Sequence, residues 1–306
     1  MLQYVVDGLV TGSAIALGAI GVTLTLSILR FANFTHGEFL TWGAYIALTL
    51  VGLMGAGAGA GGHIGPLSFG WPLLAALVAA MVLTGGLAVL LDWALFGRLR
   101  GKAGLMTLAI ASFGASLALR NLVVFLWGPK PDYFSRDIQI ALPILPRSIL
   151  GGARITPDQI FVLAVTAAAV IGLHLFLTRT FLGKAMRGTA ENVALARITG
   201  IDVRAVVRWA WMIGGGLAAL AGVLSGITVQ VRPLMGFDLL LPLFAAAILG
   251  GIGSLYGAVA GGLIVGLAES LSVPLIGAEY RQAVAFLVLI LILLARPTGL
   301  FGERGA

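Results

Sequence analysis

An asparagine, a histidine and a glutamate lie close together at the edge of a long apolar run. They are Asn33, His36 and Glu38, in the stretch FANFTHGEFLTWGAYIALTL. A metal site is not expected here, because one His and one Glu supply two ligands and the next His is distant along the chain. The cluster therefore has to be explained by the elements that position it.

The composition and the charge pattern indicate the class of protein that carries this cluster. Of 306 residues, 59% are hydrophobic and 10% are charged, whereas soluble domains carry about 25% charged residues. Gly8 to Leu29, Phe39 to Leu91 and Leu239 to Ala268 carry no charge. Because a helix needs about 20 apolar residues to cross a bilayer, we expect an all-α polytopic membrane protein with a single transmembrane domain over residues 1–306. Basic loops then explain the net charge of +7 better than nucleic-acid binding does.

The hydropathy pattern predicts nine membrane spans, in a range of about 8–10. They lie near residues 8–29, 38–54, 71–95, 104–127, 159–178, 206–229, 238–253, 255–273 and 280–296. Glycines and Pro242 interrupt the pattern within 238–273, where two short helices or a broken, re-entrant segment would both fit. Gly37 favours a broken beginning of the second span over 31–38, because glycine weakens a helix.

Basic residues in the loops orient the spans. Residues 97–104 hold three basic side chains, and 179–208 hold six basic against two acidic side chains. The positive-inside rule places both segments in the cytoplasm. We therefore expect the N-terminus outside together with His63 and Arg136, and the C-terminus inside.

The order of the elements is consistent with an internal repeat of inverted topology. The span 8–29 is followed by THGEFLTWGAYIALTL, and the oppositely directed span 206–229 is followed by LMGFDLLLPLFAAAIL. In each of these two stretches, a glycine comes shortly before an acidic residue, Glu38 or Asp238, and an apolar segment follows the acidic residue. Opposite directions of two similar units are typical of inverted repeats.

Polar side chains within the predicted spans need partners or water, because a charge at the bilayer centre costs about 2.5–3.5 kcal/mol. Arg120 lies in the fourth span and is expected to pair with Glu269 or Glu38, or else to contact a carboxylate on a substrate. The alternative for Glu38 is an interfacial cap in which it pairs with Arg30. The candidate residues for a translocation path are Asn33, His36, Glu38, Arg120, Asn121 and Glu269.

The most informative polar stretch is RTFLGKAMRGTAENVALARITGIDVRAVVR. It predicts a short amphipathic helix over about 189–199, with Thr189 as its N-cap and Gly200 as its C′ residue. Asp202 would cap the next span. The apolar face lacks Trp and Phe and basic residues are sparse, which favours a protein partner over lipid headgroups. The residues assigned to that contact are Thr189, Glu191, Ala194, Ala196, Arg197 and Gly200.

Four stretches resemble the permease subunits of branched-chain amino-acid ABC transporters. They are NFTHGEF, GKAMRGTAENVALARITGID, AAILGGIGSLYGAVAGG and the closing RPTGLFG. They occur in that family's order and spacing, and the resemblance covers about residues 5 to 303. The shorter, LivH-type subunit is the most similar. The resemblance implies an importer permease in which the helix near 189–199 is the coupling helix of a cytoplasmic segment, 179–208, seated in a groove of the ATPase.

The resemblance also implies a set of partners and a location. The partners are a second, M-type permease, two ATPase subunits and a periplasmic or extracellular substrate-binding protein, with membrane lipid around the chain. The location is the bacterial cytoplasmic (inner) membrane. Related permeases carry branched-chain amino acids, urea, short amides or aromatic acids, so the motifs leave the solute open. Arg120 stands where the family often has a neutral amide, which leaves an anionic solute open too.

Nothing in the sequence indicates an enzyme or a cofactor of this chain. The sequence has no HExxH or GxSxG motif and no cysteine, and it lacks the GxxxxGK[ST] loop that holds ATP phosphates. ATP would be bound by the partner ATPase subunits. The alternative function is a secondary transporter or channel without an ATPase, which broken helices and intramembrane charges would also suit.

Overall fold

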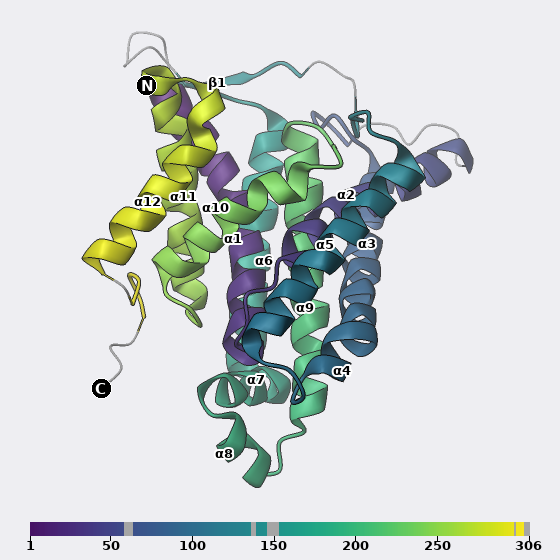
Figure 1. Ribbon diagram of the computed structural model, residues 1–306. Coiled ribbons are helices and arrows are strands. Elements are labelled where there is room, and N and C mark those ends of the chain that lie inside the picture. Colours follow the sequence, from purple (N-terminus) through teal and green to yellow (C-terminus); the bar gives the residue numbers. More distant parts are fainter. Residues whose placement is uncertain (58–63, 136–138, 146–152, 297, 303–306) are drawn as a thin grey trace.

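Long apolar helices make up most of the chain. The computed structural model describes residues 1–57, 64–135, 139–145, 153–296 and 298–302 (Figure 1). His63 and Arg136, which the charge pattern assigns to the outer side, lie outside the described residues.

The helices follow the predicted spans, with additional short elements between them. The α-helices are α1 (Leu2–Leu29), α2 (Thr35–Gly57), α3 (Trp71–Leu91), α4 (Gly97–Leu99), α5 (Leu105–Trp127), α6 (Pro157–Arg179), α7 (Phe181–Glu191), α8 (Val193–Ile198), α9 (Val203–Thr228), α10 (Met235–Gly250), α11 (Leu255–Ile276) and α12 (Arg281–Ala295). A π-helical turn, η1 (Asp92–Phe96), joins α3 to α4, and a 3₁₀ turn, η2 (Ala278–Tyr280), precedes α12.

In the described part of the chain, eight helical segments are long and apolar enough to cross a membrane, and α10 is a shorter apolar helix. The predicted class, an all-α polytopic membrane protein, is therefore confirmed. Residues 238–273 belong to two helices, α10 and α11, joined at Gly251 and Gly253, which have positive φ angles of 98° and 93°. A strand pair, β1 (Leu142–Leu145) and β2 (Ala153–Ile155), lies in the long loop before α6 and was not predicted.

Side-chain caps explain where several helices begin. Thr156 and Gln159 form a reciprocal capping box at the start of α6, with Pro157 in its first turn. The Asp202 carboxylate accepts hydrogen bonds from the backbone N–H groups of Arg204 and Ala205, so the predicted cap of α9 is confirmed. These side chains satisfy N–H groups that have no partner within the first helical turn.

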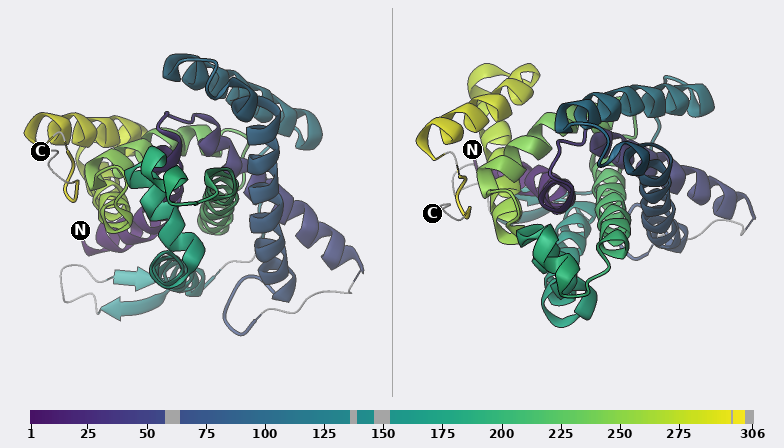
Figure 2. Two further views of the ribbon diagram at one scale, coloured as in Figure 1. Left: turned by 90° about the horizontal axis from the view of Figure 1, so that it is seen from below. Right: turned by 60° about the horizontal axis from the view of Figure 1, so that its bottom comes forward.

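The packing of the helices supports the inverted repeat. The helix α1 packs on α10 and α11, and α9 packs in the same way on α2 and α3. In addition, α2 contacts α5 as α10 contacts α12. Figure 1 shows α1 and α9 running in opposite directions through the middle of the molecule. In both views of Figure 2, α12 (yellow) and α5 (blue) lie along the same upper edge of the molecule, with α12 on the left and α5 further to the right. The series α1, α2, α3, α5 thus corresponds to α9, α10, α11, α12.

The two halves of the repeat meet at a glycine pair. Gly37 of α2 and Gly236 of α10 are so close that a Cβ added to Gly236 would lie 1.9 Å from the Gly37 carbonyl oxygen. The Gly236 N–H also donates to Thr41 Oγ1 at 3.0 Å. Small residues permit such close backbone approach between membrane helices. The beginnings of α2 and α10 are therefore fixed against each other.

Gly236→Ala is expected to destabilise the protein by about 1–3 kcal/mol, the usual cost of overpacking a tight interior. The matched control is Gly86→Ala, because Gly86 also lies in a helix but has nothing within 4 Å of its added Cβ. The measurement is the unfolding midpoint of each purified variant in detergent. Equal midpoints for the two variants would contradict the close approach of α2 and α10.

The two ends of the molecule differ in their elements. Figure 1 places α4, α7 and α8 at one end, and the N-terminus and β1 at the other. The first end carries both of the basic segments, 97–104 and 179–208. The two basic segments thus lie at the same end of the molecule, opposite the N-terminus and β1.

Candidate functional site

The chain leaves helix between α1 and α2, as the sequence predicts for residues 31–38. Arg30 ends α1 in the left-handed conformation, with φ of 59°. The Asn33 side-chain oxygen then accepts hydrogen bonds from the Thr35 backbone N–H, at 3.1 Å, and from the Thr35 hydroxyl. Asn33 therefore stabilises the first turn of α2, which begins well inside the predicted polar cluster.

His36 braces this break from the other side. Its Nε2 lies 3.2 Å from the carbonyl oxygen of Gly18 on α1, and its side chain is buried. The Phe34 backbone N–H donates to Ser112 Oγ on α5 at 3.1 Å. The polar groups of residues 33–36 thus connect the break to α1 and α5.

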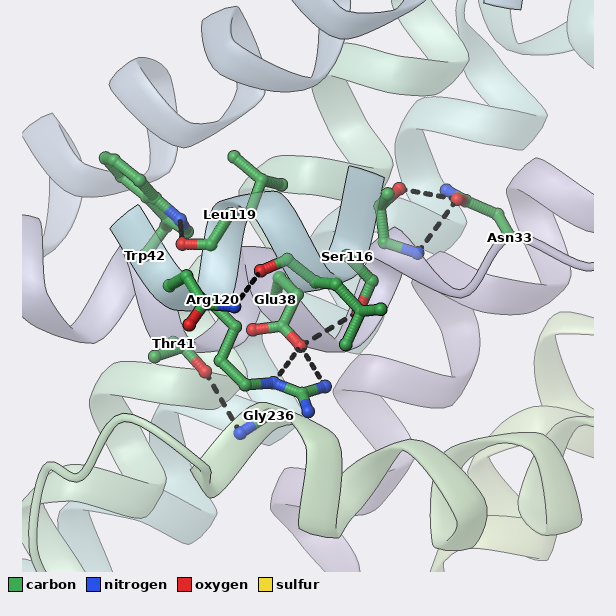
Figure 3. A network of polar contacts seen from close by, with 11 residues as sticks. Asn33, Glu38, Thr41, Trp42, Ser116, Leu119, Arg120 and Gly236 are labelled. Carbon is green, nitrogen blue, oxygen red and sulfur yellow. Dashed lines mark hydrogen bonds and ion pairs between the residues drawn. The ribbon is translucent and has the colours of Figure 1, made fainter. Parts of the chain in front are cut away.

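Glu38 is the centre of a buried polar network (Figure 3). Its Oε1 accepts hydrogen bonds from Arg120 Nη2 at 2.7 Å, from Arg120 Nε at 3.1 Å and from Ser116 Oγ at 3.0 Å. The Glu38 side chain is 1% exposed and that of Arg120 is 13% exposed. The pair joins α2 to α5, and both charges are compensated away from bulk water, as charges in such places require.

Aromatic and backbone contacts extend this network. The Arg120 guanidinium carbon lies 4.1 Å from the centre of the Phe237 ring on α10, in a cation–π contact. Trp42 Nε1 donates to the Leu119 carbonyl oxygen at 3.2 Å, one turn above Glu38 on α2. The arginine therefore connects three helices, α2, α5 and α10, which belong to both halves of the repeat.

The structure decides between the predicted alternatives. Of the two acids expected for Arg120, Glu38 pairs with it, whereas Glu269 is buried on α11 and does not. Arg30 does not pair with Glu38, because its Nη2 donates to the Glu191 carbonyl oxygen at 3.3 Å. Asn121 also stays out of the network, since it is exposed and its amide donates to the Leu117 carbonyl oxygen of its own helix.

An exposed apolar face lies beside the pair. Phe113 and Leu117 of α5 and Phe237 of α10 are 45%, 40% and 44% exposed. The ring of Phe34, at the break before α2, contacts both Phe113 and Phe244. In a bilayer these side chains contact lipid or another membrane chain, because they have no covering helix in the described structure.

The segment predicted as one helix over 189–199 forms two helices instead. Thr180 caps α7, accepting from the Gly183 N–H at 3.0 Å, and α7 runs to Glu191. Asn192 is extended and caps α8, accepting from the Leu195 N–H at 3.0 Å. Asparagine is among the strongest N-cap residues and outranks threonine. Asn192 is therefore the signal that the sequence interpretation missed.

This break changes the positions of two predicted residues. Thr189 is not an N-cap, because it lies inside α7, is fully buried, and donates to the Ala185 carbonyl oxygen at 2.8 Å. Glu191 is the last residue of α7 and not in a first turn. Glu191 and Arg30 join α7 to the end of α1 through the backbone contact described above.

The end of α8 follows the prediction. Gly200 has a φ of 83°, the Gly200 N–H donates to the Arg197 carbonyl oxygen, and the Ile201 N–H donates to the Ala196 carbonyl oxygen. This pair of bonds is a Schellman motif with Gly200 at C′. Ala196 is buried against the protein, whereas Ala194 and Arg197 are exposed, with Leu195 and Ile198 54% and 82% exposed. The exposed side of α8 is therefore largely apolar.

Three of the four sequence motifs come together at this end of the molecule. Backbone N–H groups of Leu300 and Phe301, in RPTGLFG, donate to the carbonyl oxygens of Leu249 and Gly250, in AAILGGIGS. A cavity of about 850 Å³ lies between these segments, the end of α1 and α7. Its polar lining residues are Ser27, Arg30, Arg187, Glu191, Ser254 and Thr298. Segments distant in sequence thus form one surface around α7.

A comparison with protein families agrees with the motifs. The model of the family described as branched-chain amino acid transport system / permease component matches residues 4–293. No solved structure gives a significant match.

Curated relatives match over nearly their full length. The high-affinity branched-chain amino acid transport system permease protein BraD of Pseudomonas aeruginosa is 37% identical over 309 residues, which cover 99% of this chain and 96% of BraD. The corresponding protein LivH of Escherichia coli K12 is 35% identical over 310 residues, with the same coverage. A probable LivH of Methanocaldococcus jannaschii is 28% identical over 314 residues, covering 98% of this chain and 92% of the relative. This chain therefore belongs to the family of branched-chain amino acid transport system permease components, and it is a multi-pass membrane protein.

Proposed function

We propose that this chain is the membrane-spanning permease subunit of an ABC importer for a branched-chain amino acid or a related small polar or anionic solute. The observation that carries the proposal is the α7–α8 segment, in which each helix begins at a capping side chain. This segment lies at one end of the membrane domain that matches the permease family, and α8 exposes a largely apolar side there. A short, ordered helix pair outside the spans is suited to contact with a soluble subunit.

The partners follow from the same proposal. Two ATPase subunits bind ATP, because this chain has no phosphate-binding loop. One of them contacts α8 through Ala194, Leu195, Arg197 and Ile198. A second, M-type permease covers the exposed face of α5 and α10, and a periplasmic or extracellular binding protein delivers the solute. The membrane is the bacterial cytoplasmic (inner) membrane.

The translocation path runs along the face of α5 and α10 in this proposal. Arg120 and Phe237 lie at its edge, and Asn121 is exposed on the same helix as Arg120. Glu38 holds the arginine in place, while Asn33 and His36 brace the beginning of α2. Glu269 lies elsewhere, on α11, and has no part in this path.

The proposal is tested by affinity purification of the tagged chain from cells that express its neighbouring transport genes. We expect an ATPase subunit and a second permease to be retained in stoichiometric amounts. Purification of the chain as a stable species without any ATPase, under the same mild conditions, would contradict an ABC importer and favour a transporter that works alone.

The orientation of the chain is tested by cysteine labelling, because the natural sequence contains no cysteine. We expect Ile198→Cys, on α8, to react with a membrane-impermeant maleimide only after the cells are opened. Ile140→Cys, before β1, should react in intact cells. The two isoleucines are 82% and 86% exposed, so access to reagent is not limited by burial. The opposite pattern would place α8 outside and the proposed ATPase contact with it.

A further inference from the structure

A second cavity lies beside the α7 surface, where α1, α6, α7 and α11 meet. Its volume is about 360 Å³. Ile20, Leu24, Leu177 and Leu255 are among its apolar lining residues. Its polar lining residues are Thr23, Ser27, His174, Thr178, Arg187, Ser254 and Tyr256. The lining thus combines a hydrocarbon-like wall with a polar wall that includes one cation and no carboxylate.

The polarity of the cavity changes along α1. Ile20, Thr23 and Ser27 lie on successive turns, and Ile20 is about 10 Å deeper along the helix than Ser27 at 1.5 Å per residue. His174 and Thr178 belong to the last turns of α6, just before the chain leaves the predicted span. The cavity therefore lies at the depth where lipid headgroups meet acyl chains, with its apolar end toward the bilayer interior.

One feature of the lining points to an anionic ligand. Arg187, on α7, lines both this cavity and the larger one, and no ion pair of Arg187 occurs within the described chain. A cation without an acidic partner thus faces this space.

The remaining polar groups form a frame. The Tyr256 hydroxyl lies 2.7 Å from His174 Nδ1, which joins the first turn of α11 to α6 across the cavity. Ser254 caps α11, accepting from the Gly257 N–H at 3.0 Å, so the positive end of that helix dipole faces the cavity lining. Helix N-termini combined with a cation favour phosphate groups.

We propose that this cavity binds one anionic phospholipid. Arg187 and the first turn of α11 contact its phosphate, and the first acyl carbons lie against Ile20 and Leu24. A free inorganic phosphate would leave the apolar wall uncovered, and a zwitterionic lipid would place a cationic group beside Arg187. The bound lipid would connect α6 and α7 to α1, the helix that α7 also contacts through Arg30.

The test is native mass spectrometry of the purified full chain in detergent, titrated with phosphatidylglycerol or with phosphatidylcholine. We expect selective retention of one phosphatidylglycerol. Arg187→Gln should lower its affinity about fivefold, the effect of one basic residue near an anionic headgroup. Arg187 is exposed, so this change keeps the fold intact.

Arg204→Gln is the matched control, because Arg204 is exposed at the same end of the molecule but does not line the cavity. It should retain phosphatidylglycerol as the unmodified chain does. Equal retention by Arg187→Gln and the unmodified chain would overturn the proposal. So would equal retention of phosphatidylcholine, or displacement of the lipid by millimolar inorganic phosphate, which would assign the cavity to a free anion.

Discussion

Arg120→Leu is expected to lower the stability of the protein by about 3–5 kcal/mol, because it leaves the Glu38 carboxylate buried without its cation. Glu38 is 1% exposed, and Ser116 would be its remaining hydrogen-bond donor in the described chain. The cation–π contact with Phe237 would be lost as well. The measurement is the unfolding midpoint and the monodisperse yield of the purified variant in detergent.

The double variant Glu38→Leu/Arg120→Leu should recover much of this loss, because replacing a buried ion pair by apolar residues is often close to neutral. The matched control is Arg120→Leu combined with Glu269→Leu, since Glu269 is buried but does not contact Arg120. We expect the losses in this control to add, as for sites without shared partners. Recovery in the control and not in the Glu38 double variant would contradict the pairing.

Ile198→Asp and Ala194→Trp are expected to detach the ATPase or to uncouple it from uptake. Both residues are exposed on α8, so neither change disturbs the membrane helices. A charge or a bulky ring at the centre of an interface typically costs at least about 2 kcal/mol, or ~30-fold in affinity. The measurements are the amount of ATPase that co-purifies with the chain and the rate of ATP-driven uptake in vesicles.

Ile140→Asp is the matched control for Ile198→Asp. Ile140 is 86% exposed, but it comes two residues before β1, which lies at the opposite end of the molecule (Figure 1). It should keep the ATPase and the uptake rate of the unmodified chain. Normal ATPase retention together with normal uptake in Ile198→Asp and Ala194→Trp would remove the coupling role of α8.

The sequence predicts most of the fold because the membrane restricts it strongly. Backbone groups in lipid must be paired internally, so uncharged runs of sufficient length become helices. The break near Asn33 and the ends marked by Asp202 and Gly200 were also predictable, because caps and C′ glycines act locally. The strand pair β1–β2 escaped prediction, since strands of four and three residues are too short to carry a periodic signal.

Contacts between side chains that are distant in the sequence were less predictable. Glu38 and Glu269 are chemically equal partners for Arg120, and only the packing of α2 on α5 brings Glu38 into reach. Phe237 approaches Arg120 from the other half of the repeat, a contact that no local pattern contains. By contrast, the division between α7 and α8 was readable in principle from Asn192, a stronger N-cap than the Thr189 that the interpretation chose.

The central claim is that this chain conducts its solute only as part of an ATP-driven importer. The most direct measurement is uptake of the radiolabelled solute that the cognate binding protein retains, in vesicles that contain either the full assembly or this chain alone. We predict uptake that requires the second permease, the ATPase subunits and ATP, and that is lost when this chain is omitted. Uptake by the chain alone, at a rate unaffected by ATP, would contradict the account.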